Sequence, residues 1–182
     1  MAEQLSADEL SAALAGDPSG FSAVYRVISP AVLGYFRARG VEDAEALTQD
    51  VFVDVLPKLV KVTGGHVGLR TFIFSVAHAR LVDHYRRAER TPHLAEYDPR
   101  DDTRYAVSAE DEALGSMGGI TDSLSQLNDE QREVLVLRIV ADLSIDQVAS
   151  IMNKTPGAIK QLQRRGLSAL RELVTEKDHA AS

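Results

Sequence analysis

Apolar and polar residues alternate along this chain with the period of an α-helix, and the pattern is clearest between residues 141 and 173. A first short run places Ile145, Val148 and Met152 on one face. A second, longer run repeats the apolar spacing from residue 159 to residue 173. The pattern predicts two helices, separated by only a few residues, with a shared buried side.

The residues between these two runs favour a tight turn. Ser144 can cap the first helix with its hydroxyl, and Asn153 tolerates the left-handed conformation that often ends a helix. Thr155 offers a second hydroxyl cap, and Pro156 fits the first helical position, where its missing N–H costs nothing. Two helices joined so closely should cross steeply, as in a helix-turn-helix.

The outer face of the second helix is basic. Residues 154–171 hold five basic and no acidic side chains, although the whole chain carries a formal net charge of -7. A solvated face on an ordinary surface helix is the simplest alternative. The caps, proline, turn and basic face together favour a recognition helix that lies in a DNA major groove. We predict base contacts from Lys160, Gln161 and Arg164, and backbone contacts from Thr155, Arg165 and Arg171.

Helical spacing also covers the N-terminal half, so the fold class predicted is all-α. We expect helices over about residues 3–16, 21–39, 43–59 and 70–90, with a kink or restart at Pro30 and a glycine-rich loop at 62–68. A capping box at residues 128–131 begins a further helix, which should pack on the back of the helix-turn-helix.

Residues 91–124 interrupt this pattern. They hold eight acidic and two basic residues, two prolines and the run GSMGG, a composition that favours a mobile linker over a packed element. We therefore predict two small helical domains, at 1–90 and 125–182, joined by a flexible acidic linker at 91–124.

The composition narrows the function classes. The chain has no cysteine, which excludes disulfides and thiolate metal sites and fits a reducing cytoplasm. No apolar run approaches the length of a membrane span, so we expect no membrane insertion.

A catalytic or metal site has one candidate group on the helix predicted at 70–90. His78 and His84 flank Asp83, which would suit a helical metal-dependent hydrolase. The six-residue spacing turns the two imidazoles to different faces of a helix, so they cannot share a metal easily. We expect these histidines to be solvated or to face phosphates, and we predict no cofactor, metal site or catalytic residue.

Three stretches of the chain resemble a known family. Residues 44–52 (AEALTQDVF), residues 70–87 (RTFIFSVAHARLVDHYRR) and residues 127–138 (LNDEQREVLVLR), followed by GAIK at 157–160, keep the order of its motifs. They resemble the extracytoplasmic-function (ECF) class of the sigma-70 family, the promoter-specificity subunits of bacterial RNA polymerase. A stand-alone helix-turn-helix regulator is the alternative that the residues leave open.

The resemblance implies a division of labour. The N-terminal domain would bind the β′ clamp of core RNA polymerase and open the promoter's minus-10 element. The C-terminal domain would meet the β flap and read the minus-35 element, and an anti-sigma factor would be a further partner. By position, the implied polymerase contacts are Glu45, Gln49 and Asp50, and the implied minus-10 contacts are Lys61, His66, Arg80, His84, Arg86 and Arg87.

Some residues depart from the family's pattern. Ala46 replaces an aspartate and Asp50 replaces a glutamate in the first stretch, beside the implied polymerase contacts. Phe72 replaces a tryptophan, which we interpret as a change in the core alone, and Ala79 replaces an asparagine.

Overall fold

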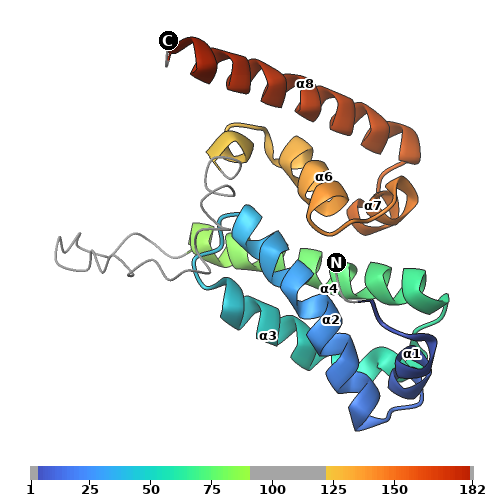
Figure 1. Ribbon diagram of the computed structural model, residues 1–182. Coiled ribbons are helices and arrows are strands. Elements are labelled where there is room, and N and C mark those ends of the chain that lie inside the picture. Colours follow the sequence, from blue (N-terminus) through green and yellow to red (C-terminus); the bar gives the residue numbers. More distant parts are fainter. Residues whose placement is uncertain (1–3, 91–121, 181–182) are drawn as a thin grey trace.

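Helices are the only regular elements among residues 4–90 and 122–180, the part of the chain that the computed structural model describes (Figure 1). The all-α prediction is therefore confirmed, and the predicted linker lies almost entirely outside the described residues. No helix in the described ranges is long and apolar enough to cross a lipid bilayer. The elements are α1 (Ala7–Leu14), α2 (Pro18–Ala38), α3 (Ala44–Val55), the 3₁₀ helix η1 (Leu56–Lys61), α4 (Gly65–Arg90), α6 (Asp129–Ile139), α7 (Ile145–Met152) and α8 (Pro156–Ala180).

An aromatic core holds the N-terminal helices together. The fully buried Tyr35 and Phe36 of α2 meet Phe52 of α3 and Phe74 of α4 in one apolar cluster. Each such side chain contributes roughly 1.5–3 kcal/mol through burial. The α2 helix runs through Pro30 as one element, without the restart that the sequence suggested.

Two local features differ from the sequence-based expectations. The third helix ends at Val55 because Pro57 cannot donate a backbone hydrogen bond, and the chain continues as η1. The fourth helix begins at Gly65, so part of the predicted glycine-rich loop forms its first turn. Gly68 suits this turn, since a Cβ there would lie 1.8 Å from the Thr63 carbonyl oxygen.

The predicted caps of the helix-turn-helix are confirmed. Ser144 Oγ accepts a hydrogen bond from the Gln147 N–H at 3.2 Å, and Gln147 Oε1 accepts one from the Ser144 N–H at 2.9 Å. Asn153 ends α7 in the left-handed conformation, with φ 52° and ψ 47°. Thr155 Oγ1 accepts a hydrogen bond from the Ala158 N–H at 3.2 Å at the start of α8. These local contacts fix the turn between α7 and α8.

The helix before the helix-turn-helix packs behind it, as predicted. Leu135 and Leu137 of α6 are buried together with Ile159 of α8. The two helices approach closely at Gly166, where a Cβ would lie 2.9 Å from Leu135 Cδ1. Arg138 of α6 donates a hydrogen bond to the Leu143 carbonyl oxygen, which ties α6 to the segment that precedes α7.

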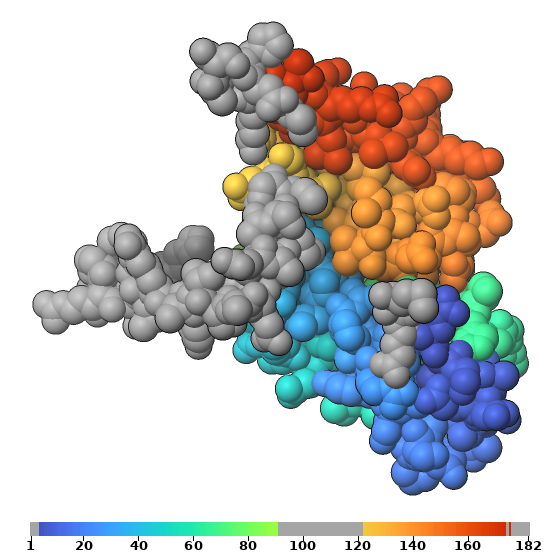
Figure 2. All heavy atoms as spheres, in the orientation of Figure 1, coloured from blue at the N-terminus to red at the C-terminus, as the bar shows by residue number. Residues whose placement is uncertain are grey.

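The C-terminal helices rest directly on the N-terminal ones. Figure 1 shows α6 and α7 between α8 and the pair α2 and α4, and α7 contacts α4 while α6 contacts α2. The space-filling view shows this contact over a broad front (Figure 2). The helices of the two predicted domains are therefore in contact within the described residues.

The close approach at Gly166 yields a stability prediction. Gly166→Val should destabilise the C-terminal helices by about 1–3 kcal/mol, because the added carbons overlap the fully buried Leu135. The change would appear as a lower urea midpoint with an unchanged slope. Gly157→Ala is the control, because its Cβ would meet only Thr155 Oγ1 at 4.0 Å. Equal midpoints for the two variants would contradict the packing described.

Candidate nucleic-acid interface

The outer face of α8 presents the polar residues that the sequence assigned to DNA. Lys160, Arg164 and Arg171 line one shallow hollow of about 300 Å³, together with Gln163 and Leu167. None of the three basic side chains forms an ion pair with another described residue. Their charges are therefore open to a ligand. Every residue predicted to read the minus-35 element is exposed: Thr155, Lys160, Gln161, Arg164, Arg165 and Arg171.

The buried side of α8 holds this face in position. Ile159 is fully buried against the other C-terminal helices, and Gln163 Oε1 accepts a hydrogen bond from Arg138 Nε at 3.3 Å. Lys154, although basic, is used within the fold, because its Nζ lies 2.7 Å from Glu130 Oε1. The helix thus presents its basic residues from a rigid support.

A second polar surface runs along α4. A hollow of about 560 Å³ is lined by Lys58, Lys61, Val62, Thr63, Gly68, Thr71, Phe72 and Ser75. A neighbouring hollow of about 500 Å³ is lined by Asp54, Phe72, Ser75, Val76, Ala79, Arg80 and Asp83. Phe72 and Ser75 line both, so the two hollows adjoin, and we call them together the α4 groove.

The α4 groove combines features that suit single-stranded nucleic acid. Lys58 and Lys61 supply positive charge at one end, and Phe72 supplies an aromatic surface on which a base can stack. The sequence analysis did not single out Lys58, which belongs to none of the three motif stretches, or Ser75, which lies within one of them but has a small side chain without charge. Phe72 was interpreted as a core residue alone, whereas it also faces the groove.

Arg80, at the other end of the groove, is held by a carboxylate. Its guanidinium donates two hydrogen bonds to Asp54 Oδ2, and the Nε distance is 2.8 Å. The hydrogen bond with Asp54 raises the pKa of Arg80 above its ordinary value, and the charges of Asp54, Asp50 and Asp83 add to the effect. Asp54 therefore competes with a phosphate for two of the guanidinium N–H groups.

The other residues predicted to contact the minus-10 element do not share one surface. His84 is half-buried, and its ring packs edge-on to Tyr85 with centroids 5.7 Å apart. Arg87 is exposed. Arg86 lines a hollow between α4 and α6, and His66 lines one beside Asp142 and Gln147. The structure thus brings Lys61 and Arg80 to one groove and places His66 and Arg86 where the two halves meet.

His78 differs from the sequence-based expectation. It was predicted to be solvated or to face phosphates, but its Nδ1 lies 2.7 Å from Glu133 Oε1 of α6. Burial raises the pKa of the neighbouring Tyr35 phenol well above its ordinary value, so this hydroxyl is a donor at neutral pH.

Among the described residues, no group of three His, Asp or Glu side chains could hold a metal ion.

The three residues assigned to the polymerase lie exposed on α3. Glu45 pairs with Arg37, and the hydrogen bond from this guanidinium is the main cause that lowers the pKa of the Glu45 carboxyl. Gln49 and Asp50 form no ion pair or hydrogen bond with another described residue. Val53, one turn beyond Gln49, is 70% exposed. The sequence analysis missed it, because one exposed valine within the mostly apolar run at 51–55 gives no signal of an interface.

Comparisons with known proteins identify the family of this chain. The family model described as "Sigma-70, region 4" matches residues 123–172. The ECF RNA polymerase sigma factor SigD of Mycobacterium tuberculosis is 30% identical over 180 residues, which cover 92% of this chain and 84% of SigD. The chain belongs to the ECF sigma factors.

Two further comparisons describe the extent of the similarity. The ECF sigma factor BldN of Streptomyces coelicolor is 28% identical over 168 residues, which are 90% of this sigma factor but 64% of BldN. The solved structure of CnrH in complex with the cytosolic domain of CnrY superposes with a TM-score of 0.69 at 17% identity, covering 93% of this chain and 96% of CnrH. CnrH therefore shares the fold of this sigma factor.

The ion pair in the α4 groove yields a binding prediction for this sigma factor. Asp54→Asn should raise the affinity of the groove for a single-stranded oligonucleotide up to roughly fivefold, because an exposed ion pair that competes with DNA is worth at most about 1 kcal/mol. Fluorescence anisotropy with a labelled oligonucleotide measures the change. Asp83→Asn removes the same charge from the same groove without a hydrogen bond to Arg80. Equal gains for both variants would mean that net charge, and not the release of Arg80, sets the affinity.

Proposed function

We propose that this sigma factor binds core RNA polymerase and directs it to promoters of one sequence class. In this proposal residues 1–90 form the domain that binds the clamp and the minus-10 element, and residues 125–182 form the domain that binds the minus-35 element. Residues 91–124 link them. The polymerase supplies the chemistry of RNA synthesis in the cytoplasm, and the sigma factor supplies recognition without catalytic residues of its own.

The exposed basic face of α8 carries the proposal. It lies on the second helix of a capped helix-turn-helix, within the residues that match sigma-70 region 4. Recognition helices of this kind contact base edges with their N-terminal residues and phosphates with later ones. Lys160, Gln161 and Arg164 are therefore the base-reading residues we propose, with Thr155, Arg165 and Arg171 nearer the backbone.

The α4 groove supports the assignment of the minus-10 element to the N-terminal domain. Lysines and a half-buried aromatic ring in one depression suit the backbone and the bases of a separated strand. Lys61 and Arg80 are the contacts that the groove supports best. His84 and Arg87 lie beyond Arg80 on α4, while His66 and Arg86 are exposed beside the C-terminal helices, outside the groove.

Transcription with purified components separates a sigma factor from a stand-alone regulator. With core polymerase as the only other protein, the chain should produce run-off transcripts from a subset of fragments of its own genome. A regulator would produce none without a separate sigma factor. A transcript pattern that is unchanged when the chain is left out would reject the proposal.

An inhibitory protein partner is also proposed. CnrH, which shares this fold, was solved bound to the cytosolic domain of CnrY. A partner of that kind would keep the sigma factor from core polymerase, including its β′ clamp and β flap.

The exposed face of α3 yields a prediction about the polymerase. Asp50→Arg should weaken binding to core polymerase at least tenfold, because a reversed charge in a polar interface costs more than about 1.4 kcal/mol. Helicity and melting temperature should stay unchanged, since Asp50 is exposed. Competition against a labelled sigma factor measures the binding. Glu42→Arg, an exposed reversal in the turn before α3, is the control. Unaltered competition by Asp50→Arg would place the polymerase contact elsewhere.

The recognition helix yields a prediction about specificity. Arg164→Ala should weaken holoenzyme binding to the cognate minus-35 element by roughly 1–3 kcal/mol and should affect a scrambled element much less. Arg171→Ala should weaken both about equally and should reduce the salt dependence. Titrations at two salt concentrations compare the two variants. If Arg164→Ala weakens binding to both DNAs equally, this arginine contacts only the backbone.

A further inference from the structure

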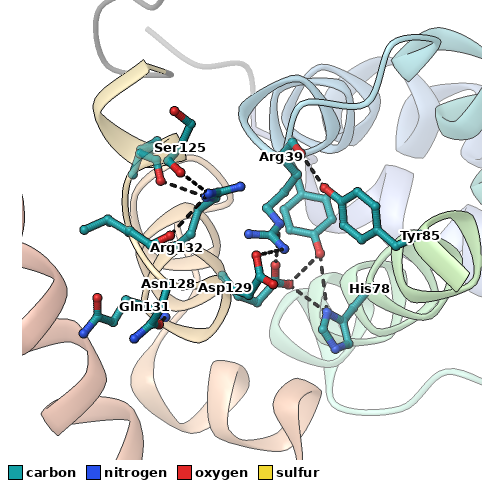
Figure 3. A network of polar contacts seen from close by, with 12 residues as sticks. Arg39, His78, Tyr85, Ser125, Asn128, Asp129, Gln131 and Arg132 are labelled. Atoms are coloured by element: carbon teal, nitrogen blue, oxygen red, sulfur yellow. Dashed lines mark hydrogen bonds and ion pairs between the residues drawn. The ribbon is translucent and has the colours of Figure 1, made fainter. Parts of the chain in front are cut away.

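A carboxylate of the C-terminal half is buried in the N-terminal half. Glu133 of α6 is only 3% exposed, and Oε1 accepts a hydrogen bond from the Tyr35 hydroxyl at 2.6 Å. His78 Nδ1 lies 2.7 Å from the same oxygen, and Arg39 Nε lies 3.1 Å from Oε2. We call Tyr35, Arg39 and His78 the donor cluster. Figure 3 shows Arg39 and His78 reaching from the N-terminal helices toward α6.

The donor cluster is fixed by its own half of the molecule. The Arg39 guanidinium lies over the Tyr85 ring, 5.7 Å from its centroid, and the Tyr85 hydroxyl donates a hydrogen bond to the Arg39 carbonyl oxygen. Arg39 itself is 7% exposed. A buried guanidinium without an anion is strongly unfavourable, so this site favours a carboxylate. Glu133 supplies it from within the same chain.

Three further hydrogen bonds join the halves at the beginning of α4. Gln147 Nε2 of α7 donates hydrogen bonds to Thr71 Oγ1 at 3.0 Å and to the Val67 carbonyl oxygen at 3.3 Å. Arg70 donates one to the Ala141 carbonyl oxygen. The contacts with α4 extend from Val67 to His78, which fixes a single docked orientation of the C-terminal helices.

In this docked arrangement the chain cannot bind both promoter elements at the same time. Two elements named for positions 10 and 35 lie about 25 base pairs apart, which is roughly 85 Å of duplex at about 3.4 Å per base pair. The 25-residue α8 is itself only about 37 Å long. In the docked arrangement α7 is hydrogen-bonded to Thr71, which lines the α4 groove. The two reading surfaces must therefore separate before both can be used.

We propose that Glu133 is a latch: by occupying the donor cluster, it holds the free sigma factor closed, with the helix-turn-helix docked beside the α4 groove. Binding to core polymerase and promoter opens the latch. The role of the opening in transcription rests on the proposed function, whereas the closed state rests on the observed contacts of Glu133.

Energy transfer between two dyes tests the latch in the full-length protein. The chain has no cysteine, so Glu42→Cys and Ser168→Cys place one dye on each half. Glu133→Gln keeps the side chain's shape but removes its charge, and it should lower the transfer efficiency of the free protein. Its affinity for a single-stranded oligonucleotide should rise at least fivefold as Thr71 is released. Glu130→Gln is the matched control, because Glu130 lies on the same helix and pairs with Lys154 of its own half.

A second variant acts from the opposite side. Tyr35→Phe removes one hydroxyl from the donor cluster and leaves α6 unaltered, so it should produce a smaller change in the same direction. Circular dichroism checks that both variants keep the helicity of the parent. Unchanged transfer in a fully helical Glu133→Gln protein would overturn the latch. Lower transfer without a gain in affinity would overturn its inhibitory role.

The two proposals fail in different ways. If the unmodified chain supports no run-off transcription with core polymerase, the proposed function is wrong, and the transfer measurement still decides whether Glu133 holds the halves together. If transcription is supported but addition of core polymerase leaves the transfer efficiency unchanged, the function stands and the latch is rejected.

Discussion

Burying the carboxylate of Glu133 away from water is unfavourable unless donors surround it. Tyr35 of α2 and His78 of α4 contact one carboxylate oxygen, Arg39 at the end of α2 forms an ion pair with the other, and Tyr35 lies 98 residues earlier in the chain. The position of α6 therefore depends, together with the contacts of Gln147 and Arg70, on an aromatic core to which α6 contributes no ring. A defect in the packing of Tyr35 or Phe74 would thus reach the DNA-reading helix through one charged group.

The features that could be predicted from the sequence are those whose causes are local. Ser144, Asn153 and Thr155 act on backbone groups within a few residues, so the caps and the turn of the helix-turn-helix follow from neighbouring side chains. The exposed basic face of α8 follows from the 3.6-residue period in the same way. The break between α3 and η1 was missed, although Pro57 marks it, because the apolar pattern continues across that proline.

The features that could not be predicted depend on residues far apart in the chain. His78 lies one turn from the buried Phe74 and Leu81 on the same face of α4, but only the docking of α6 makes it a partner of Glu133. One signal was present, since Glu133 shares a helical face with the buried Val136 and Leu137. An acidic residue on an apolar face requires a buried partner. The sequence does not say which residue this partner is, and the hydrogen bond between Arg80 and Asp54 was hidden for the same reason.

The amide of Gln147 has two ends with separate roles. Its oxygen completes the cap of α7, while its nitrogen bonds to Val67 and Thr71 across the contact between the halves. A glutamate would complete the same capping box but has no N–H to donate. Replacing Gln147 by glutamate, which exchanges one nitrogen for an oxygen, would therefore remove these contacts with α4 while the cap of the helix-turn-helix remains. The reading helix would thus keep its place in the helix-turn-helix while its attachment to α4 weakens.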